Sequence, residues 1–231
     1  MVALVLLPGM DGTGSLFSSL VSALGSEVET IVVSYPKDLP LGYKELEQVA
    51  RSFLPANKPY VILGESFSGP IAISIAASHP DGLIGLILCS SFARNPIPLL
   101  SRLSPLLRLV PVKFAPVSLL SIFLLGRFSS ERLRTALRQA LAPVSAAAFR
   151  ARARAVLSAD VSPLCAQITV PTLYLRAMED RVVSGTSLEI VVRSMIGLQV
   201  VEFEAPHFLL QVLPSEAAKA IQKFLDRLLL K

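Results

Sequence analysis

The chain has 231 residues, of which 52% are hydrophobic and 17% charged, and this fits one globular domain with a sizeable core and room for an insertion. Two cysteines and two histidines are too few for a disulfide framework and show no metal-ligand spacing, so we expect no metal or other cofactor. The net charge of +5 comes mainly from an arginine-rich stretch between Arg94 and Asp160, for which solvated helix faces are a simpler explanation than a nucleic-acid partner.

The mean hydropathy of +0.61 is high and raises the question of a membrane segment. The first residues, "MVALVLLPG", lack basic residues and are too short for a signal peptide. The apolar stretch between Lys113 and Arg127 contains Pro116 and falls short of the ~20 residues that a spanning helix needs. We therefore expect a soluble, cytoplasmic protein without a transmembrane segment and with an unusually apolar surface.

Six apolar runs have the length of strands, and helical patterns separate most of them. The runs are continuous rather than alternating, which is typical of parallel strands buried on both faces. The expected strands are 2–7, 30–36, 60–65, 85–91, 172–177 and 199–205. The expected helices are about 15–24, 43–54, 67–78, 186–195 and 215–230. This alternation predicts an open, parallel α/β sheet flanked by helices.

Residues 93–160 interrupt that rhythm, because they contain no strand-like run. They contain proline-punctuated segments rich in leucine, alanine and arginine, such as "SRLSPLLRLVP" and "SERLRTALRQAL". We interpret them as short amphipathic helices that form a cap. The predicted organisation is therefore a core of residues 1–92 and 161–231 with a helical cap, 93–160, inserted in it.

The stretch "LGESFSGP" predicts a nucleophile elbow, a tight turn between a buried strand and a helix. Such a turn requires small residues two positions before and two after the nucleophile. Ser66 has Gly64 and Ser68 in these places, and Gly69 follows. If Ser68 were the nucleophile, Pro70 would occupy one of them, so Ser66 is the candidate.

A serine nucleophile needs a base and a carboxylate to orient it. His207 follows the last strand, whereas His79 closes the helix after the elbow and is expected to be a surface residue. Asp180 follows the fifth strand and is our choice for the acid, with Glu179 as the alternative. All three groups then lie at the carboxyl edge of the sheet, where active sites of such folds form.

The stretch "LPGMDGTG" after the first strand predicts an oxyanion loop. We expect the backbone N–H groups of Met10 and Phe67 to bind the oxyanion, and Gly9 to allow close approach of the backbone. A phosphate-binding loop is disfavoured, because neither G-x-G-x-x-G spacing nor a following Gly-Lys-Ser/Thr is present.

With "LPGMDGTG", "GESFSG", "ED" followed by "RVV", and "PHFLLQVLP", the sequence resembles the α/β-hydrolase superfamily over nearly its whole length. It looks most like small bacterial carboxylesterases and pimeloyl-carrier methyl-ester esterases, whose cap has four helices. Three features depart from the family: Pro8-Gly9 stands where the oxyanion loop usually begins His-Gly, Ser68 replaces a glycine, and the chain starts at the family's third strand. The resemblance therefore implies a core of six parallel strands that lacks the first two family strands.

These features predict a serine hydrolase that cleaves small apolar carboxylic esters through an acyl-enzyme and a Ser66–His207–Asp180 triad. The arginines of the cap suggest a second substrate class, an acyl ester or thioester on an acidic carrier protein. A third alternative is a binding protein of this fold that holds a small molecule without catalysis. A fourth is a peroxidase or a carbon–carbon bond hydrolase that uses the same triad.

Overall fold

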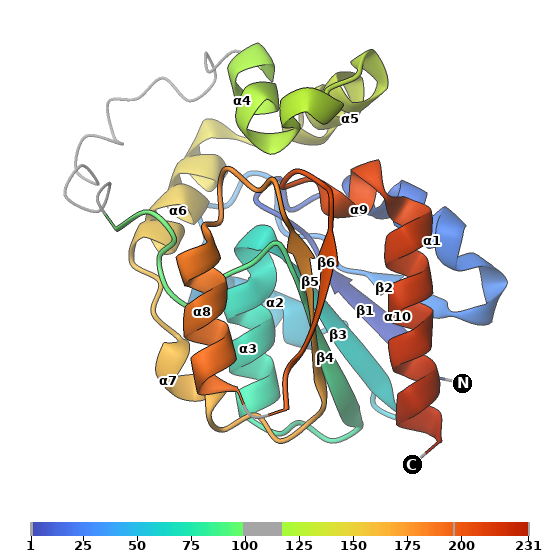
Figure 1. Cartoon of the computed structure of the whole chain (residues 1–231). Coiled ribbons are helices and arrows are strands. Elements are labelled where there is room, and N and C mark those ends of the chain that lie inside the picture. Colours follow the sequence, from blue (N-terminus) through green and yellow to red (C-terminus); the bar gives the residue numbers. More distant parts are fainter. Residues whose placement is uncertain (1, 99–116, 196, 231) are drawn as a thin grey trace.

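A six-stranded, all-parallel sheet forms the centre of the computed structural model, which describes residues 2–98, 117–195 and 197–230 (Figure 1). Its strands are β1 (Ala3–Leu7), β2 (Glu29–Val32), β3 (Tyr60–Glu65), β4 (Leu83–Cys89), β5 (Thr172–Ala177) and β6 (Gln199–Phe203). Their order across the sheet is β2-β1-β3-β4-β5-β6. The predicted six-stranded parallel core is confirmed.

Burial explains why the strand predictions succeeded and where they ran too long. β1 and β3 are buried along their whole length, so their apolar runs have no solvent face. β2 is an edge strand and ends at Val32, not at residue 36 as predicted, because the chain turns inward there and Tyr35 is buried. β4 ends at Cys89 rather than 91, because Ser90 adopts a left-handed backbone conformation with φ 46°.

Helices cover both faces of the sheet (Figure 1). One face carries α2 (Tyr43–Arg51), α3 (Gly69–Ala77), α7 (Ser162–Cys165) and α8 (Gly185–Ser194), and the other carries α1 (Ser18–Leu24) and α10 (Pro214–Leu229). The short helices α7 and α9 (Leu209–Val212) were not expected from the sequence. Within the described ranges, no helix combines the length and the apolar character needed to cross a bilayer.

Three further helices, α4 (Val117–Leu124), α5 (Glu131–Leu141) and α6 (Ala146–Leu157), lie in the chain between β4 and β5. In Figure 1, α4 and α5 lie above the carboxyl ends of the strands, and a small apolar cluster that includes Leu16, Leu137 and Phe208 joins them to the core. The expected helix in "SRLSPLLRLVP" lies outside the described residues. The division into core and cap at residues 93 and 160 stays a prediction.

Candidate active site

The turn between β3 and α3 places Ser66 at the carboxyl edge of the sheet. Ser66 has a backbone φ of 47°, the left-handed conformation that is strained for a residue with a side chain. The turn is also crowded: a Cβ added at Gly64 would lie 2.7 Å from the Cβ of Ala72 and 2.9 Å from the carbonyl of Ser68. A residue with a side chain would therefore clash at position 64, two residues before the serine. Pro70 lies in the first turn of α3, as expected.

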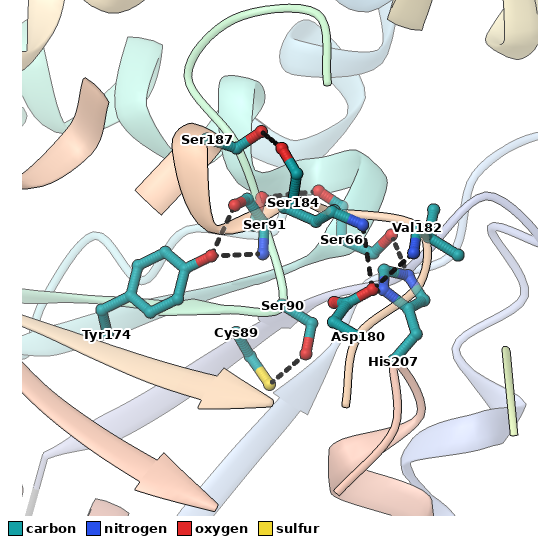
Figure 2. Close-up of polar contacts among 11 residues, drawn as sticks. Ser66, Cys89, Ser90, Ser91, Tyr174, Asp180, Val182, Ser184, Ser187 and His207 are labelled. Atoms are coloured by element: carbon teal, nitrogen blue, oxygen red, sulfur yellow. Dashed lines mark hydrogen bonds and ion pairs between the residues drawn. The ribbon is translucent and has the colours of Figure 1, made fainter. Parts of the chain in front are cut away.

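The elbow is held from the side of β4 by Ser91. The Ser91 hydroxyl donates to the Ser66 carbonyl at 2.6 Å, and a Cβ added at Gly69 would lie 1.7 Å from the same hydroxyl oxygen. The Tyr174 hydroxyl in turn donates to the Ser91 carbonyl at 2.6 Å and accepts from the Ser91 N–H at 3.1 Å (Figure 2). Gly69 is thus needed for contact between the elbow and the end of β4.

Ser68, two residues after the candidate nucleophile, is fully buried. Its hydroxyl donates to the carbonyl of Pro8, at the start of the loop after β1. Because that bond uses its proton, the hydroxyl accepts from Tyr35, whose oxygen lies 2.8 Å away. Ser68 therefore does more than fit the space beside the elbow: it ties the elbow to the expected oxyanion loop.

Ser66, His207 and Asp180 form a hydrogen-bonded chain (Figure 2). The Ser66 Oγ lies 2.7 Å from His207 Nε2, and His207 Nδ1 lies 2.8 Å from Asp180 Oδ2. Asp180 as a carboxylate can only accept, so His207 carries its proton on Nδ1 and its Nε2 is free to accept the proton of Ser66. The side chains of His207 and Asp180 are 4% and 5% exposed, which shields the pair from water.

The other acid and the other histidine lie elsewhere. Glu179 points to the surface and pairs with Arg127 of the cap at 2.5 Å. His79 has a backbone φ of 50° at the end of α3 and contacts Thr169 at 3.3 Å. The structure therefore brings Asp180, and not Glu179, to His207.

The loop after β1 runs beside Ser66. Gly9 and Met10 line the same cavity as Ser66 and His207, whereas the Phe67 side chain is buried beneath the elbow and stacks on Tyr43 with ring centroids 4.8 Å apart. A turn in the loop is closed by the Gly12 N–H, which donates to the Gly9 carbonyl at 3.0 Å. This placement fits the expected role of the Met10 and Phe67 backbone as oxyanion donors, which stays a prediction.

A cavity of about 430 Å³ opens between the sheet edge and the cap helices α4 and α5. Its polar groups, Glu65, Ser66 and His207 among them, lie on the side of the sheet. Its walls are mostly apolar and include Leu16, Leu120, Leu124, Leu137, Leu141 and Phe208. Arg181 also lines it and donates to the carbonyl of Ile122 at 3.4 Å. The cavity can therefore hold an apolar group with its polar end at Ser66.

Glu65, directly before Ser66, is a buried carboxyl that the sequence analysis did not consider. Burial raises its pKa from the ordinary value of 4.5 to about 7, although hydrogen bonds from Gln211 and from the Gly9 N–H oppose that rise. Gln211 Nε2 donates to Glu65 at 2.8 Å. Glu65 therefore binds the loop after β1 at Gly9, the residue next to Met10.

Arg152 on α6 and Tyr35 after β2 are also functional candidates that the sequence analysis missed. Both are buried and both contact the loop after β1: Arg152 donates to the Met10 carbonyl, and the Tyr35 N–H donates to the Gly12 carbonyl at 2.7 Å. A signal for Arg152 existed in the helical period: it shares one face of α6 with the buried residues Ala148, Ala155 and Val156. No comparable local pattern marks Tyr35.

Comparisons with known proteins agree with this architecture. Among solved structures, a thermophilic esterase from Thermogutta terrifontis matches with a TM-score of 0.85 and 19% identity, covering 99% of this chain and 90% of the other. The enol-lactonase from Burkholderia xenovorans LB400 matches with a TM-score of 0.81 and 18% identity, covering 100% and 92%. At these identities the two matches show a shared fold.

A curated relative and a family model match the sequence directly. Phytyl ester synthase 1, chloroplastic, of Arabidopsis thaliana is 34% identical over 117 residues, which is 47% of this chain but only 16% of the synthase. The model of the Alpha/beta hydrolase family matches residues 4–220, which include the elbow, the loop after β1, Asp180 and His207. The chain therefore belongs to the Alpha/beta hydrolase family.

Proposed function

We propose that this protein is a serine hydrolase that cleaves carboxylic esters through an acyl-enzyme intermediate. The observation that carries the proposal is the hydrogen-bonded chain from Ser66 Oγ through His207 to Asp180, with distances of 2.7 and 2.8 Å, at the polar side of an apolar cavity. This arrangement supplies a nucleophile, a base and an orienting carboxylate together.

The proposed reaction has two halves. In the first, Ser66 Oγ attacks the ester carbonyl carbon while His207 Nε2 takes the serine proton, and the same proton then leaves with the alcohol. In the second, His207 takes a proton from water, which attacks the acyl carbon, and the proton returns to Ser66 as the acid departs. Asp180 stabilises the imidazolium in both halves, and the Met10 and Phe67 N–H groups donate hydrogen bonds that stabilise the negative charge developing on the carbonyl oxygen.

Hydrolysis of p-nitrophenyl esters by wild type and Ser66→Ala tests this proposal. We expect kcat to fall by about 10⁴-fold or more in the variant, because the nucleophile is lost while the fold is kept. Ser18→Ala, at an exposed serine of α1, is the matched control and should equal wild type. A fluorophosphonate probe should label the peptide that contains Ser66 in wild type. Turnover retained by a folded Ser66→Ala variant would refute the assignment.

The walls of the cavity favour an apolar acyl or alcohol group. Leucine and phenylalanine side chains of α4 and α5, together with Phe208 next to His207, line the space beside Ser66. Each substrate methylene buried there therefore contributes about 0.8 kcal/mol of favourable transfer free energy to binding. We therefore propose a small apolar ester as the substrate.

A second candidate function is transfer of the acyl group to an alcohol instead of water. The likeness to an ester synthase over 117 residues favours this candidate, and an apolar cavity can admit an alcohol with an apolar chain. The alcohol oxygen would attack the acyl carbon and give up its proton through His207. Product analysis with an isoprenoid alcohol added to the assay tests it: a new ester that forms at the expense of the free acid supports transfer, and the free acid alone supports hydrolysis.

An acidic carrier protein as acyl donor stays a prediction, and the structure reduces the charge available for it. Arg127 pairs with Glu179, and Arg134 and Arg138 both lie within 4.0 Å of Glu131. Arg152 is buried. If a carrier nevertheless docks by charge, added salt should slow hydrolysis of a carrier-linked substrate steeply and leave a small ester unaffected. Equal salt dependence of both substrates would contradict carrier docking.

A further inference from the structure

Arg152 belongs to the cap helix α6, yet its side chain ends inside the loop after β1. The residue is 1% exposed. Its Nη1 donates to the carbonyls of Met10 at 3.0 Å and Asp11 at 2.7 Å, and its Nη2 donates to the carbonyl of Pro36 at 2.9 Å. One guanidinium from the cap thus binds two successive peptide units of the expected oxyanion loop.

Burial of a cation costs free energy, and the surrounding backbone offsets this cost by supplying hydrogen-bond acceptors and space for the guanidinium. The side-chain hydrogen bonds described for Arg152 all go to neutral carbonyl oxygens, and desolvation lowers the pKa of the guanidinium although Asp11 lies near. The loop also makes room for the side chain: a Cβ added at Gly12 would lie 2.5 Å from Arg152 Nη1. Gly12, with a φ of 67°, leaves the space that the guanidinium occupies.

Hydrogen bonds from the core and from Arg152 hold the peptide groups on both sides of the Met10 N–H. From the core side, Ser68 binds the Pro8 carbonyl and Glu65 accepts from the Gly9 N–H. From the cap side, Arg152 binds the Met10 and Asp11 carbonyls. The peptide that carries the Met10 N–H lies between these two sets of contacts, and its own carbonyl, that of Gly9, accepts from Gly12. The direction of the Met10 N–H is therefore determined by the core and the cap together.

We propose that Arg152 is a positioning residue that couples seating of the cap helix α6 to a competent oxyanion hole. The proposal rests on the proposed serine-hydrolase function and on Met10 as an oxyanion donor. Arg152 acts through the loop backbone and needs no contact with the substrate. When α6 is seated, the Met10 N–H points at the oxyanion, and when the Arg152 contacts are lost, the loop relaxes and the donor is misplaced.

This role predicts a specific kinetic signature. An oxyanion exists only in the transition state and the tetrahedral intermediates, so a misplaced donor lowers kcat and leaves ground-state binding almost unchanged. Misplacement of a catalytic group by ~1 Å typically costs about 10²-fold in rate. We therefore expect loss of the Arg152 contacts to reduce kcat by about 10- to 100-fold with KM within about threefold of wild type.

The test compares Arg152→Met and Arg152→Lys in the full chain, with Arg154→Met as the matched control at an exposed arginine of the same helix. Arg152→Met should show the full loss of kcat. Arg152→Lys keeps the charge but offers one nitrogen in place of two, so its kcat should lie between those of Arg152→Met and wild type. Arg154→Met should match wild type in kcat and KM.

A transition-state mimic supplies the second readout. A trifluoromethyl ketone forms a hemiketal oxyanion with Ser66, whereas the corresponding methyl ketone binds mainly as the intact ketone. The inhibition constant of the fluorinated ketone should rise by the same factor by which kcat falls, and that of the methyl ketone should stay within about threefold of wild type. A residue that merely anchors the cap would not separate the two inhibitors.

A control corrects for variant protein that does not fold. The reactive serines of each preparation are labelled to completion with a fluorophosphonate probe, and all rates are expressed per labelled site. If Arg152→Met does not fold, Arg152→Lys decides, because it retains a hydrogen-bonding cation. Wild-type kcat per labelled site in the Lys variant, a rise in KM at constant kcat, or equal weakening of both ketones would each overturn the proposal. Absence of Ser66-dependent turnover in wild type would instead overturn the proposed function on which it rests.

Discussion

Asp180 divides its two carboxylate oxygens between the active site and its own loop. Oδ2 lies 2.8 Å from His207 Nδ1 (Figure 2). Oδ1 accepts from the N–H groups of Val182 and Val183 at 2.8 and 2.9 Å. The backbone bonds hold the carboxylate in one orientation. The neighbouring Glu179 has neither set of contacts, because its carboxylate faces Arg127.

Replacing Asp180 with Asn tests this assignment. The Asn side chain keeps the size of Asp but loses the charge that stabilises the imidazolium, so we expect kcat to fall by about 10³- to 10⁴-fold. Glu179→Gln is the matched control and should keep kcat within about twofold, because it removes an exposed ion pair. Steady-state kinetics with a p-nitrophenyl ester measure both. The opposite ranking of the two variants would move the acid to Glu179.

Glu65 makes the stability of the protein depend on pH. Its pKa is about 7 in the folded protein and near 4.5 when unfolded, so the folded state binds the proton more tightly. The free energy of unfolding therefore falls as pH rises from about 4.5 to about 7, by up to roughly 3 kcal/mol, and levels off above that range.

Replacing Glu65 with Gln should remove this part of the pH dependence. Urea unfolding at several pH values between 5 and 8 measures it as the difference in the free energy of unfolding between wild type and variant, which cancels the contributions of groups that both proteins share. Glu27→Gln, at an exposed carboxyl, should follow the wild-type curve. Parallel curves for wild type and Glu65→Gln would show that Glu65 titrates normally.

At the scale of elements, the packing of β3 against α3 determines the conformation of the elbow between them. The strand ends against the first turn of the helix with no space for a Cβ at Gly64, which would lie 2.7 Å from Ala72, 2.9 Å from the Ser68 carbonyl and 3.1 Å from Gly69. The strand and helix therefore meet at a distance that residue 64 determines. The left-handed Ser66 depends on this geometry.

Gly64→Ala should destabilise the fold by about 1–3 kcal/mol and lower kcat, because the elbow must shift to admit the methyl group. Gly185→Ala is the matched control: a Cβ there would meet only Arg176 at 3.6 Å, and the residue lies in α8. We expect that control to keep kcat and to gain up to about 1 kcal/mol, since alanine favours helices over glycine. Thermal unfolding and kinetics measure both, and a neutral Gly64→Ala variant would contradict the steric argument.

At the scale of the whole molecule, the cavity exists because the helices between β4 and β5 lie over the carboxyl edge of the sheet (Figure 1). The sheet side contributes the polar groups, and α4 and α5 contribute apolar walls such as Leu120, Leu137 and Leu141. If the proposed function holds, α4 and α5 should influence which substrate chain fits, whereas the proposed reacting groups lie at the sheet edge.

Leu141→Trp should shorten the acyl chains that the protein accepts, because the larger ring enters the cavity. We expect kcat/KM to fall by about tenfold or more for decanoate relative to acetate p-nitrophenyl esters. Gln139→Trp, on the exposed side of α5, should leave the chain-length profile unchanged. An unchanged profile in Leu141→Trp would place the acyl chain elsewhere.

Much of the fold could be predicted because its signals are local. Continuous apolar runs identify strands buried on both faces, and the step from β3 into "GESFSG" identifies the elbow through a steric rule that involves five neighbouring residues. The strand ends were less accurate: β2 ends at Val32 and β4 at Cys89, and although the N–H groups of Val33 and Ser90 still donate to Leu6 and Leu175, the chain then turns toward contacts that the local sequence does not specify. The helices α7 and α9 were missed because four residues are too few to show a helical period.

The parallel α/β architecture and the order of the candidate serine, acid and histidine along the chain could be inferred from the sequence, since burial and turn sterics act between near neighbours. The three-dimensional structure was needed to show that His207 contacts Asp180 and not Glu179, that the Ser68 hydroxyl binds the Pro8 carbonyl, and that Arg152 binds the loop after β1. The helical period places Arg152 of the run "RARAR" on the apolar face of α6, but it does not identify the partner Met10, which is 142 residues away. Hydrogen bonds across such separations depend on how the cap packs against the core, which no local pattern specifies.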